Sequence, residues 1–197
     1  VLQLELIYRY CHVHDGLLVH AYSEDCLAPW AGPEGRSGCV WSEGLGWYAL
    51  ILTEVLDLLP AGYEGKRMVE NQLNQLLAGL EKYQNRENGL WRQVVDRTDD
   101  VDNWCDTSGS AMFLYTWKWA ADKGIVPVAT AGAVLRKGYE GLLARIVPGE
   151  DGLPDVHTAC QGLCVQKCYE DYIHYPKTVN AQEAVCGCLW ALVAAIG

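Results

Sequence analysis

The segment Glu87-Asn88-Gly89-Leu90-Trp91 decides the fold, because its pattern occurs three times along the chain. The earlier copy is His14-Asp15-Gly16-Leu17-Leu18, and the later copy is Glu150-Asp151-Gly152-Leu153-Pro154. Asp-Gly and Asn-Gly mark turns in which the glycine takes a positive φ. We expect the leucine after each glycine to return into the core. A repeated turn of this kind predicts a repeated structural unit.

Helical spacing of apolar residues precedes each copy, and a second helical stretch follows it after a long irregular connection. The six predicted helices span residues 2–11, 40–59, 63–84, 108–122, 130–147 and 180–196. Two short breaker segments separate the units, Leu59-Pro60-Ala61-Gly62 and Lys123-Gly124-Ile125-Val126-Pro127. Val94-Val95 and Tyr172-Ile173 could form short strands at most. The chain therefore reads as three helical hairpins.

A unit of two helices that recurs after more than about 50 residues is typical of a helical array or toroid. The long connections, residues 13–40, 85–107 and 148–179, all follow the first helix of a hairpin, so we expect them on one side of the array. Connections this long are usually functional, and a binding face is predicted there. Residues 1–197 are expected to form a single all-helical domain that is incomplete at its N-terminus. Missing upstream sequence or a second chain would complete it.

The overall composition is that of a globular protein. Half of the 197 residues are hydrophobic, a fifth are charged, and the formal net charge is −10. No cluster of Lys and Arg is present, which argues against nucleic acid and anionic membranes as partners. No apolar run is long enough to cross a bilayer. Eight Trp and eleven Tyr stand against one Phe, a choice that suits stacking on sugar rings, although core packing is the competing interpretation.

Nine cysteines favour a secreted protein with some disulfides, with the cytoplasm as the alternative. Cys160, Cys164 and Cys168 are four residues apart, which is not the C-x2-C spacing of zinc sites. We therefore expect no metal and no cofactor. Pairing of these cysteines with Cys186 or Cys188 is the preferred interpretation, and buried thiols are the alternative.

Several motifs together resemble glycoside hydrolase family 105, the unsaturated rhamnogalacturonyl hydrolases. The resemblance covers nearly the whole chain, in order and with similar spacing. The matching segments are Gly16-Leu17-Leu18-Val19-His20-Ala21-Tyr22-Ser23-Glu24, Pro29-Trp30-Ala31, Val40-Trp41-Ser42-Glu43-Gly44-Leu45-Gly46-Trp47-Tyr48, Asp57-Leu58-Leu59-Pro60, Gly89-Leu90-Trp91-Arg92-Gln93-Val94-Val95-Asp96, Asp106-Thr107-Ser108-Gly109-Ser110-Ala111-Met112-Phe113 and the tail from Val179-Asn180 to Gly187.

The resemblance implies an (α/α)6 toroid, of which this chain would be the carboxyl-terminal half, and an oligosaccharide substrate with an unsaturated uronyl sugar. The implied chemistry begins when a carboxylic acid protonates the 4,5 double bond. Water then adds, and the resulting hemiketal opens. Ordinary glycosidases instead use two carboxylates around the glycosidic bond.

Three departures from the family pattern bear on this chemistry. The acid/base Asp of the family lies upstream of the His20 motif, and this chain does not contain it. Ser23 stands where the family usually has Asp. Glu43 stands where the family has an Arg that helps to hold the substrate, and this inversion of charge should cost on the order of a few kcal/mol beside a ligand carboxylate.

The resemblance places the substrate-binding residues on the loop face. The predicted set is His20, Trp41, Glu43, Trp47, Trp91, Gln93 and Ser108. Each has a structural alternative: a hydrogen-bonded His, core packing for each Trp, and helix capping for Ser108. Glu24 and Asp25 could replace the missing Asp, although a solvated loop is the simpler interpretation.

Three hypotheses follow. The first is a hydrolase of unsaturated uronyl oligosaccharides. The second is a catalytically inactive carbohydrate-binding relative, which Ser23 and Glu43 suggest. The third is another α/α-toroid enzyme, such as a metal-dependent cyclase or transferase.

Overall fold

The computed structural model describes residues 1–197 and contains seven helices. The helices are α1 (Leu2–Cys11), α2 (Ser42–Leu58), α3 (Lys66–Tyr83), α4 (Thr107–Asp122), α5 (Val128–Leu143), α6 (Tyr169–Ile173) and α7 (Gln182–Ile196). All six helices predicted from the sequence are present, with small differences at their ends. The short helix α6 was not predicted.

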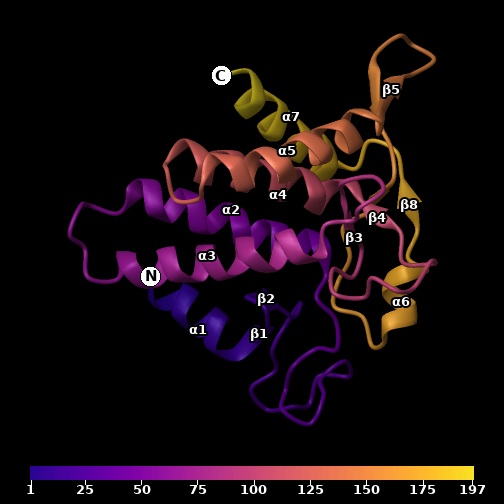
Figure 1. The fold of residues 1–197 in the computed structure, drawn as a ribbon. Helices are drawn as coiled ribbons and strands as arrows, with labels where there is room; N and C mark the ends of the chain where they lie inside the picture. The colour runs from indigo at the N-terminus through magenta and orange to yellow at the C-terminus, as the bar shows by residue number, and fades with distance from the viewer.

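The helices form two rows, which Figure 1 shows as a stack of nearly parallel rods. Helices α2, α4 and α7 pack against one another in one row, with α4 between the other two. Helix α3 packs on α1 and α2, and α5 packs on α4, so that α1, α3 and α5 form the second row. This succession of helical hairpins is part of an (α/α)6 toroid, as the sequence predicted.

The long connections also contain strands. Eight short strands form four antiparallel pairs: β1 (His12–His14) with β2 (Leu17–Leu18), β3 (Trp91–Arg92) with β4 (Cys105–Asp106), β5 (Ile146–Pro148) with β6 (Pro154–Val156), and β7 (Ala159–Cys160) with β8 (Lys177–Thr178). The prediction of loop strands was wrong at Tyr172-Ile173, which lies in α6. Val94 makes only an isolated bridge to Trp41. Pairs this short carry no periodic sequence signal.

Two of the repeated turns lock one hairpin onto the next. Gly16 has a φ of +73°, and a Cβ there would lie 2.2 Å from the backbone of Gln75 in α3. Gly89 has a φ of +72°, and a Cβ there would lie 2.2 Å from the carbonyl oxygen of Lys137 in α5. Only glycine fits both the conformation and the space. Leu17 and Leu90 are fully buried beside these turns, as the sequence predicted.

The third copy of the turn differs. Gly152 also has a positive φ, but nothing lies within 4 Å of the place where its Cβ would be. Leu153 is 64% exposed. The hairpin of β5 and β6 projects from the body of the molecule in Figure 1. The expected burial of Leu153 was therefore wrong, because no helix of this chain covers the turn.

Glycines also let the helices of the α2, α4 and α7 row approach closely at their first turns. A Cβ on Gly109 of α4 would lie 2.1 Å from Oγ of Ser42 in α2. A Cβ on Gly187 of α7 would lie 3.2 Å from Cβ of Ala111 in α4. The amino-terminal ends of α2 and α4 therefore meet, and the start of α7 lies beside α4. We call this end of the molecule the loop pole, because the long connections gather there.

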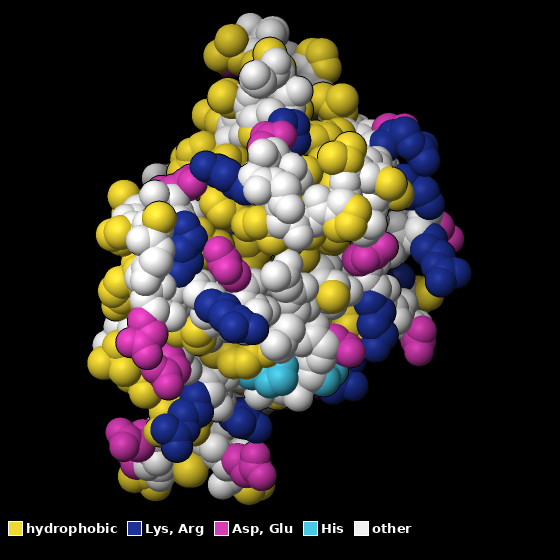
Figure 2. Space-filling view, turned by 60° about the vertical axis from the view of Figure 1, so that its left-hand side comes forward, with side chains coloured by type: hydrophobic (Ala, Val, Ile, Leu, Met, Phe, Trp, Pro, Cys, Tyr) yellow, Lys and Arg dark blue, Asp and Glu magenta, His cyan; other side chains and the backbone are white.

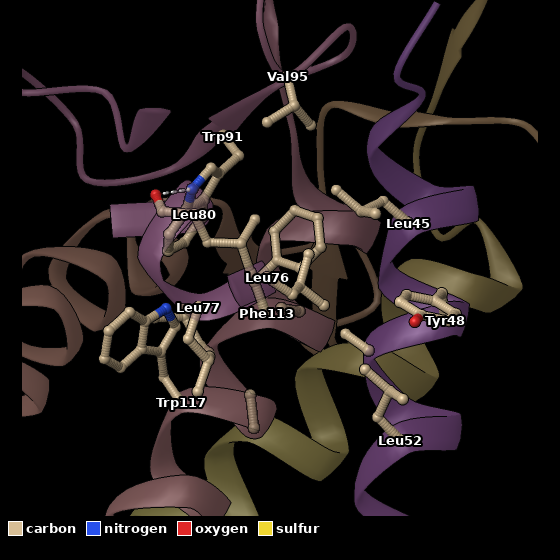
Figure 3. Close-up of a cluster of buried hydrophobic side chains, with 14 of the residues drawn as sticks. Leu45, Tyr48, Leu52, Leu76, Leu77, Leu80, Trp91, Val95, Phe113 and Trp117 are labelled. Atoms are coloured by element: carbon tan, nitrogen blue, oxygen red, sulfur yellow. Dashed lines mark hydrogen bonds between the residues drawn. The ribbon is translucent and has the colours of Figure 1, made fainter. Parts of the chain in front are cut away.

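The main core fills the space between the two rows, and Figure 3 shows part of it. Trp91 and Phe113 pack edge to face with ring centroids 5.4 Å apart. Nε1 of Trp91 donates a hydrogen bond of 2.7 Å to the carbonyl oxygen of Leu80. Burial of such large aromatic groups supplies much of the apolar area that stabilises the fold.

A second, smaller core joins the three long connections at the loop pole. Its buried members are Cys39, Trp41, Val94, Cys160, Leu163, Tyr172 and Ile173. Backbone hydrogen bonds connect the same segments, from Ser42 to Gln93 and from Thr107 to Thr158. The prediction that the connections lie together on one side is confirmed.

Apolar side chains remain exposed away from this pole. A groove of about 460 Å³ runs between α1 and α2, and eleven of its fourteen lining residues are hydrophobic. On α7, Leu189, Trp190, Val193 and Ile196 are between 44% and 88% exposed. Figure 2 shows hydrophobic side chains over much of one face, among scattered charges. None of the helices combines the length and the apolar character needed to cross a membrane.

Candidate active site at the loop pole

His20 lies at the centre of the loop pole. Its imidazole ring lies 4.4 Å from the ring of Trp41, centroid to centroid, with the planes tilted by 35°. Its Nδ1 is 2.8 Å from the phenol oxygen of Tyr172. His20 also lines the groove between α1 and α2. The ring is thus held by two aromatic neighbours and borders open space.

Hydrogen-bond accounting fixes the tautomer of His20. The phenol oxygen of Tyr172 accepts a hydrogen bond from the backbone N–H of Gln166, at 3.3 Å. Burial raises the pKa of Tyr172, so the phenol keeps its proton and donates it to Nδ1 of His20. Burial lowers the pKa of His20 to about 4, so the ring is neutral near pH 7. The remaining proton is on Nε2, which makes that nitrogen a hydrogen-bond donor.

Two carboxyl groups meet at the first turns of α2 and α4. The hydroxyl oxygen of Ser108 lies 2.6 Å from Oδ2 of Asp106 and 3.1 Å from Oε2 of Glu43. Asp106 is fully buried and Glu43 is only 2% exposed. Asp106 also accepts hydrogen bonds from the backbone N–H groups of Gly109, at 2.7 Å, and Cys160, at 3.0 Å. Asp106 is therefore the N-cap of α4.

Burial changes the protonation of both carboxyl groups. It raises the pKa of Glu43 to about 8, and the charge of Asp106 raises it further, while the Ser108 hydroxyl lowers it. Burial also raises the pKa of Asp106, and hydrogen bonds from Ser108, Gly109 and Cys160 act in the opposite direction. Glu43 is thus neutral near pH 7. The charge inversion expected from the change of Arg to Glu does not arise in this state.

Unpartnered polar atoms lie close to this pair. The side-chain amide of Gln93 is fully buried, and neither its oxygen nor its nitrogen has a hydrogen-bond partner. Nε1 of Trp41 is also buried without a partner. Buried polar groups normally have partners, so these atoms mark a place for a water molecule or a ligand group.

The predicted site residues do not all gather. His20, Trp41, Glu43, Gln93 and Ser108 lie at the loop pole. Trp47 lies one turn further along α2, is 39% exposed, lines the groove with His20 and packs edge to face on Trp190.

The assignment of Trp91 to the binding face was wrong. Trp91 is fully buried in the main core and its N–H is bonded to Leu80. The leucine and tryptophan that follow Gly89 turn inward together, because the turn that precedes them docks on α5. No face of this ring is free for a sugar.

Asp25 does not replace a catalytic acid. Its carboxylate accepts hydrogen bonds from the Ser23 hydroxyl at 2.7 Å and from the backbone N–H of Leu27 at 3.0 Å, within an exposed loop. The N–H of Leu27 and the Ser23 hydroxyl lower its pKa, which makes it a poor proton donor. Glu24 is exposed as well.

The expected disulfides are absent, and all nine cysteines are free. Cys160 belongs to the small core of the loop pole, whereas Cys188 belongs to the main core. The proposed pairing of these two residues was therefore wrong, because they pack in different clusters.

Sequence reasoning missed Asp106, Tyr172 and Glu183 as members of the site. Asp106 had a usable signal, because an acidic residue two positions before Ser108 at a helix start predicts a cap. Tyr172 had none, since its contact with His20 joins residues 152 positions apart. Glu183 lies in the first turn of α7, and its charge contributes to the raised pKa of Glu43.

Comparison with solved structures supports the fold. A glycoside hydrolase from family 105 of C. acetobutylicum superposes with a TM-score of 0.91 and 24% sequence identity, over 98% of this chain and 56% of that chain. A possible member of the GH105 family from Salmonella enterica serovar Paratyphi A gives a TM-score of 0.80 and 23% identity, over 100% of this chain and 49% of that chain. At these identities the similarity shows the fold alone.

Curated relatives are similar over shorter segments. The 24.9 kDa protein in the picA locus of Rhizobium radiobacter is 37% identical over 132 residues, which are 66% of this chain and 56% of that protein. The unsaturated 3S-rhamnoglycuronyl hydrolase of Formosa agariphila is 24% identical over 127 residues, 61% of this chain and 33% of that enzyme. The matched part is thus about half of the first relative and a third of the second.

The family assignment rests on the match to a family model. Residues 3–196 match the model of Glycosyl Hydrolase Family 88. The resemblance to glycoside hydrolases inferred from the motifs is thereby confirmed. Because the match covers nearly the whole sequence, the chain belongs to Glycosyl Hydrolase Family 88.

Proposed function

We propose that this chain forms part of a hydrolase that acts on oligosaccharides ending in an unsaturated uronyl sugar. The observation that carries the proposal is the convergence of His20, Trp41 and the neutral Glu43 at one pole of a family 88 fold. Trp41 and His20 offer ring surfaces beside a donor N–H, a combination that suits a sugar. The name of the Formosa agariphila relative supports the same substrate class.

The chemistry proposed is protonation of the 4,5 double bond by a carboxylic acid, addition of water at C5, and opening of the hemiketal. Within this chain, Nε2–H of His20 is placed to donate to a sugar oxygen. Neutral Glu43 removes the repulsion that a carboxylate would exert on the uronyl carboxylate. Binding the sugar in a fixed orientation is the contribution of these residues.

The test is an assay of the complete protein on unsaturated galacturonyl-rhamnose, following loss of the double bond and release of the keto-sugar. His20→Ala should lower kcat/KM about 10- to 100-fold, because it removes a hydrogen bond and a ring contact at the substrate. His174→Ala is the control, since His174 is exposed and lies outside the groove. Equal activity of both variants would contradict the assigned role of His20.

A carbohydrate-binding protein without catalysis is the second candidate. The observation that favours it is Glu43 in the position of the family's Arg. Binding of the disaccharide with no release of keto-sugar would establish this candidate in place of the first.

We also propose that a further segment or chain packs against the exposed apolar surface. The groove between α1 and α2 and the exposed side chains of α7 lie at the two open edges of the helical array. Packing of helices there would bury surface that is costly to leave in water.

A further inference from the structure

The site contains a chain of three oxygens that must share protons. One hydroxyl has one proton, so Ser108 cannot donate to Glu43 and Asp106 together. The shorter contact, 2.6 Å, joins Ser108 to Asp106. Oγ of Ser108 must then accept at its 3.1 Å contact, and Oε2 of Glu43 must supply that proton.

Asp106 is the ionised member of the pair. Every neighbour bonded to its carboxylate is a donor, namely Ser108 and the backbone N–H groups of Gly109 and Cys160. Two of these are amides, which cannot reverse their role. The amino-terminal end of α4 adds a favourable potential for negative charge. Glu43 has no such backbone donors, so it holds the proton.

Glu43 reaches the open part of the site. Its Oε1 has no hydrogen-bond partner in the chain and is not among the atoms closed off from solvent. The next residue, Gly44, lines the groove and lies against the rings of Trp41 and His20. Trp47, one turn on from Glu43, lines the same groove. A molecule in the groove would meet Glu43 at its end.

We propose that Glu43, Ser108 and Asp106 form a proton relay that accepts the proton of the water added to the sugar. This inference rests on the proposed function. Glu43 is the catalytic residue of the relay, because it touches the water. Ser108 and Asp106 act through it and are positioning residues.

The step balances in atoms and charge. A carboxylic acid outside this chain first protonates C4, which leaves C5 electron-poor. The water oxygen bonds to C5 with the electron pair of the O–H bond that breaks. Its proton moves to Oε1 of Glu43, the proton of Oε2 moves to Ser108, and the hydroxyl proton of Ser108 moves to Asp106. The negative charge of Asp106 is neutralised, and reversal of the relay later returns the proton to solvent.

The charged and titratable groups around Glu43 are consistent with one shared proton. Asp106 faces it from the start of α4, Glu183 from α7 and Cys160 from β7. Burial raises the pKa of Cys160, so this thiol stays neutral. His20 is neutral near pH 7 because burial lowers its pKa. No cation among these groups favours ionisation of Glu43.

The test compares wild type, Ser108→Ala and Ser108→Thr of the complete protein on unsaturated galacturonyl-rhamnose over a range of pH. Ser108→Ala should lower kcat about 100-fold with little change in KM, because the relay is broken while the binding residues remain. Its acidic limb should move to higher pH, since only ionised Glu43 can then take the proton. Ser108→Thr keeps the hydroxyl and should restore most of kcat. Wild-type kcat and pH profile in Ser108→Ala would overturn the relay.

A second measurement separates the relay from the proposed function. If the wild-type protein does not act on the disaccharide, the proposed function fails. The relay is then judged by the infrared difference spectrum between wild type and Glu43→Gln near neutral pH, without any ligand. A carbonyl band of a protonated carboxyl that Glu43→Gln removes supports the relay. Absence of such a band overturns it.

Discussion

At the scale of the residue, the position of a proton decides how the site can work. Glu43 would repel an anionic sugar if it were ionised. In the folded chain it is enclosed between α2, α4 and α7, and it holds a proton that a surface carboxyl would have lost. The same enclosure keeps His20 neutral and makes it a donor through Nε2.

The first prediction concerns the pH dependence of stability. The unfolded chain releases the Glu43 proton near the ordinary glutamate pKa of 4.5, and in the folded chain burial raises that pKa to about 8. Between these values the folded state binds more protons, so the free energy of unfolding falls as pH rises, by up to about 1.4 kcal/mol per pH unit. Glu43→Gln should lack this contribution in urea titrations at several pH values. Glu24→Gln, on the exposed loop, is the control, and parallel curves for wild type and Glu43→Gln would refute the assignment.

The second prediction concerns Tyr172. Tyr172→Phe removes the phenol that donates to Nδ1 of His20, so the ring is free to change tautomer or turn. Affinity for the disaccharide should fall by about 1 kcal/mol, measured by calorimetry. Tyr169→Phe is the control, because its phenol bonds to Asp100 away from His20. Unchanged affinity in Tyr172→Phe would show that His20 is oriented by its contact with Trp41 alone.

At the scale of the element, glycine turns join the hairpins. The turns at Gly16 and Gly89 rest on α3 and α5, and each helix has a glycine close by, Gly79 and Gly141. A Cβ on either of these would lie 2.1 Å or less from the carbonyl oxygen of Asp15 or Asn88. Backbone therefore packs directly on backbone at both junctions.

The third prediction tests this junction. Gly16→Ala combines a positive φ with a backbone clash and should cost more than about 3 kcal/mol of stability. Gly152→Ala has a similar φ and open space, so it isolates the conformational cost, about 1 kcal/mol. Thermal or urea unfolding of both variants gives the comparison. Equal losses would mean that contact with α3 contributes nothing.

At the scale of the whole molecule, the helical array is open at both ends. Helix α7 exposes Leu189 and Val193, and the turn at Gly152 has no helix beneath it. A toroid closes when its first hairpin meets its last, and each hairpin otherwise contacts only its neighbours. The apolar edges are the consequence.

The fourth prediction follows from these edges. Residues 1–197 expressed alone should self-associate at micromolar concentration and bind a hydrophobic dye. Replacing Leu189 and Val193 together by Ser should weaken the association seen by analytical ultracentrifugation. Val101→Ser is the control, because Val101 is 89% exposed on a loop away from α7. A monomeric wild-type chain would contradict the prediction.

The sequence by itself determined the framework. Periodic apolar residues and Gly/Pro breakers act locally, so the six long helices and their grouping into hairpins could be predicted. The repeat also placed the long connections at one pole. His20 and Trp41 could be assigned to the loop face from their motifs. Such features depend on residues a few positions apart.

Only the tertiary structure decided how individual side chains are used. Trp91 and Trp41 occur in similar motifs, yet one is in the main core and the other lies against His20. The protonation of Glu43 depends on Ser108 and Asp106, which are more than 60 positions away. Burial and hydrogen bonding between distant segments exist only after the helices pack, and local sequence carries no record of them.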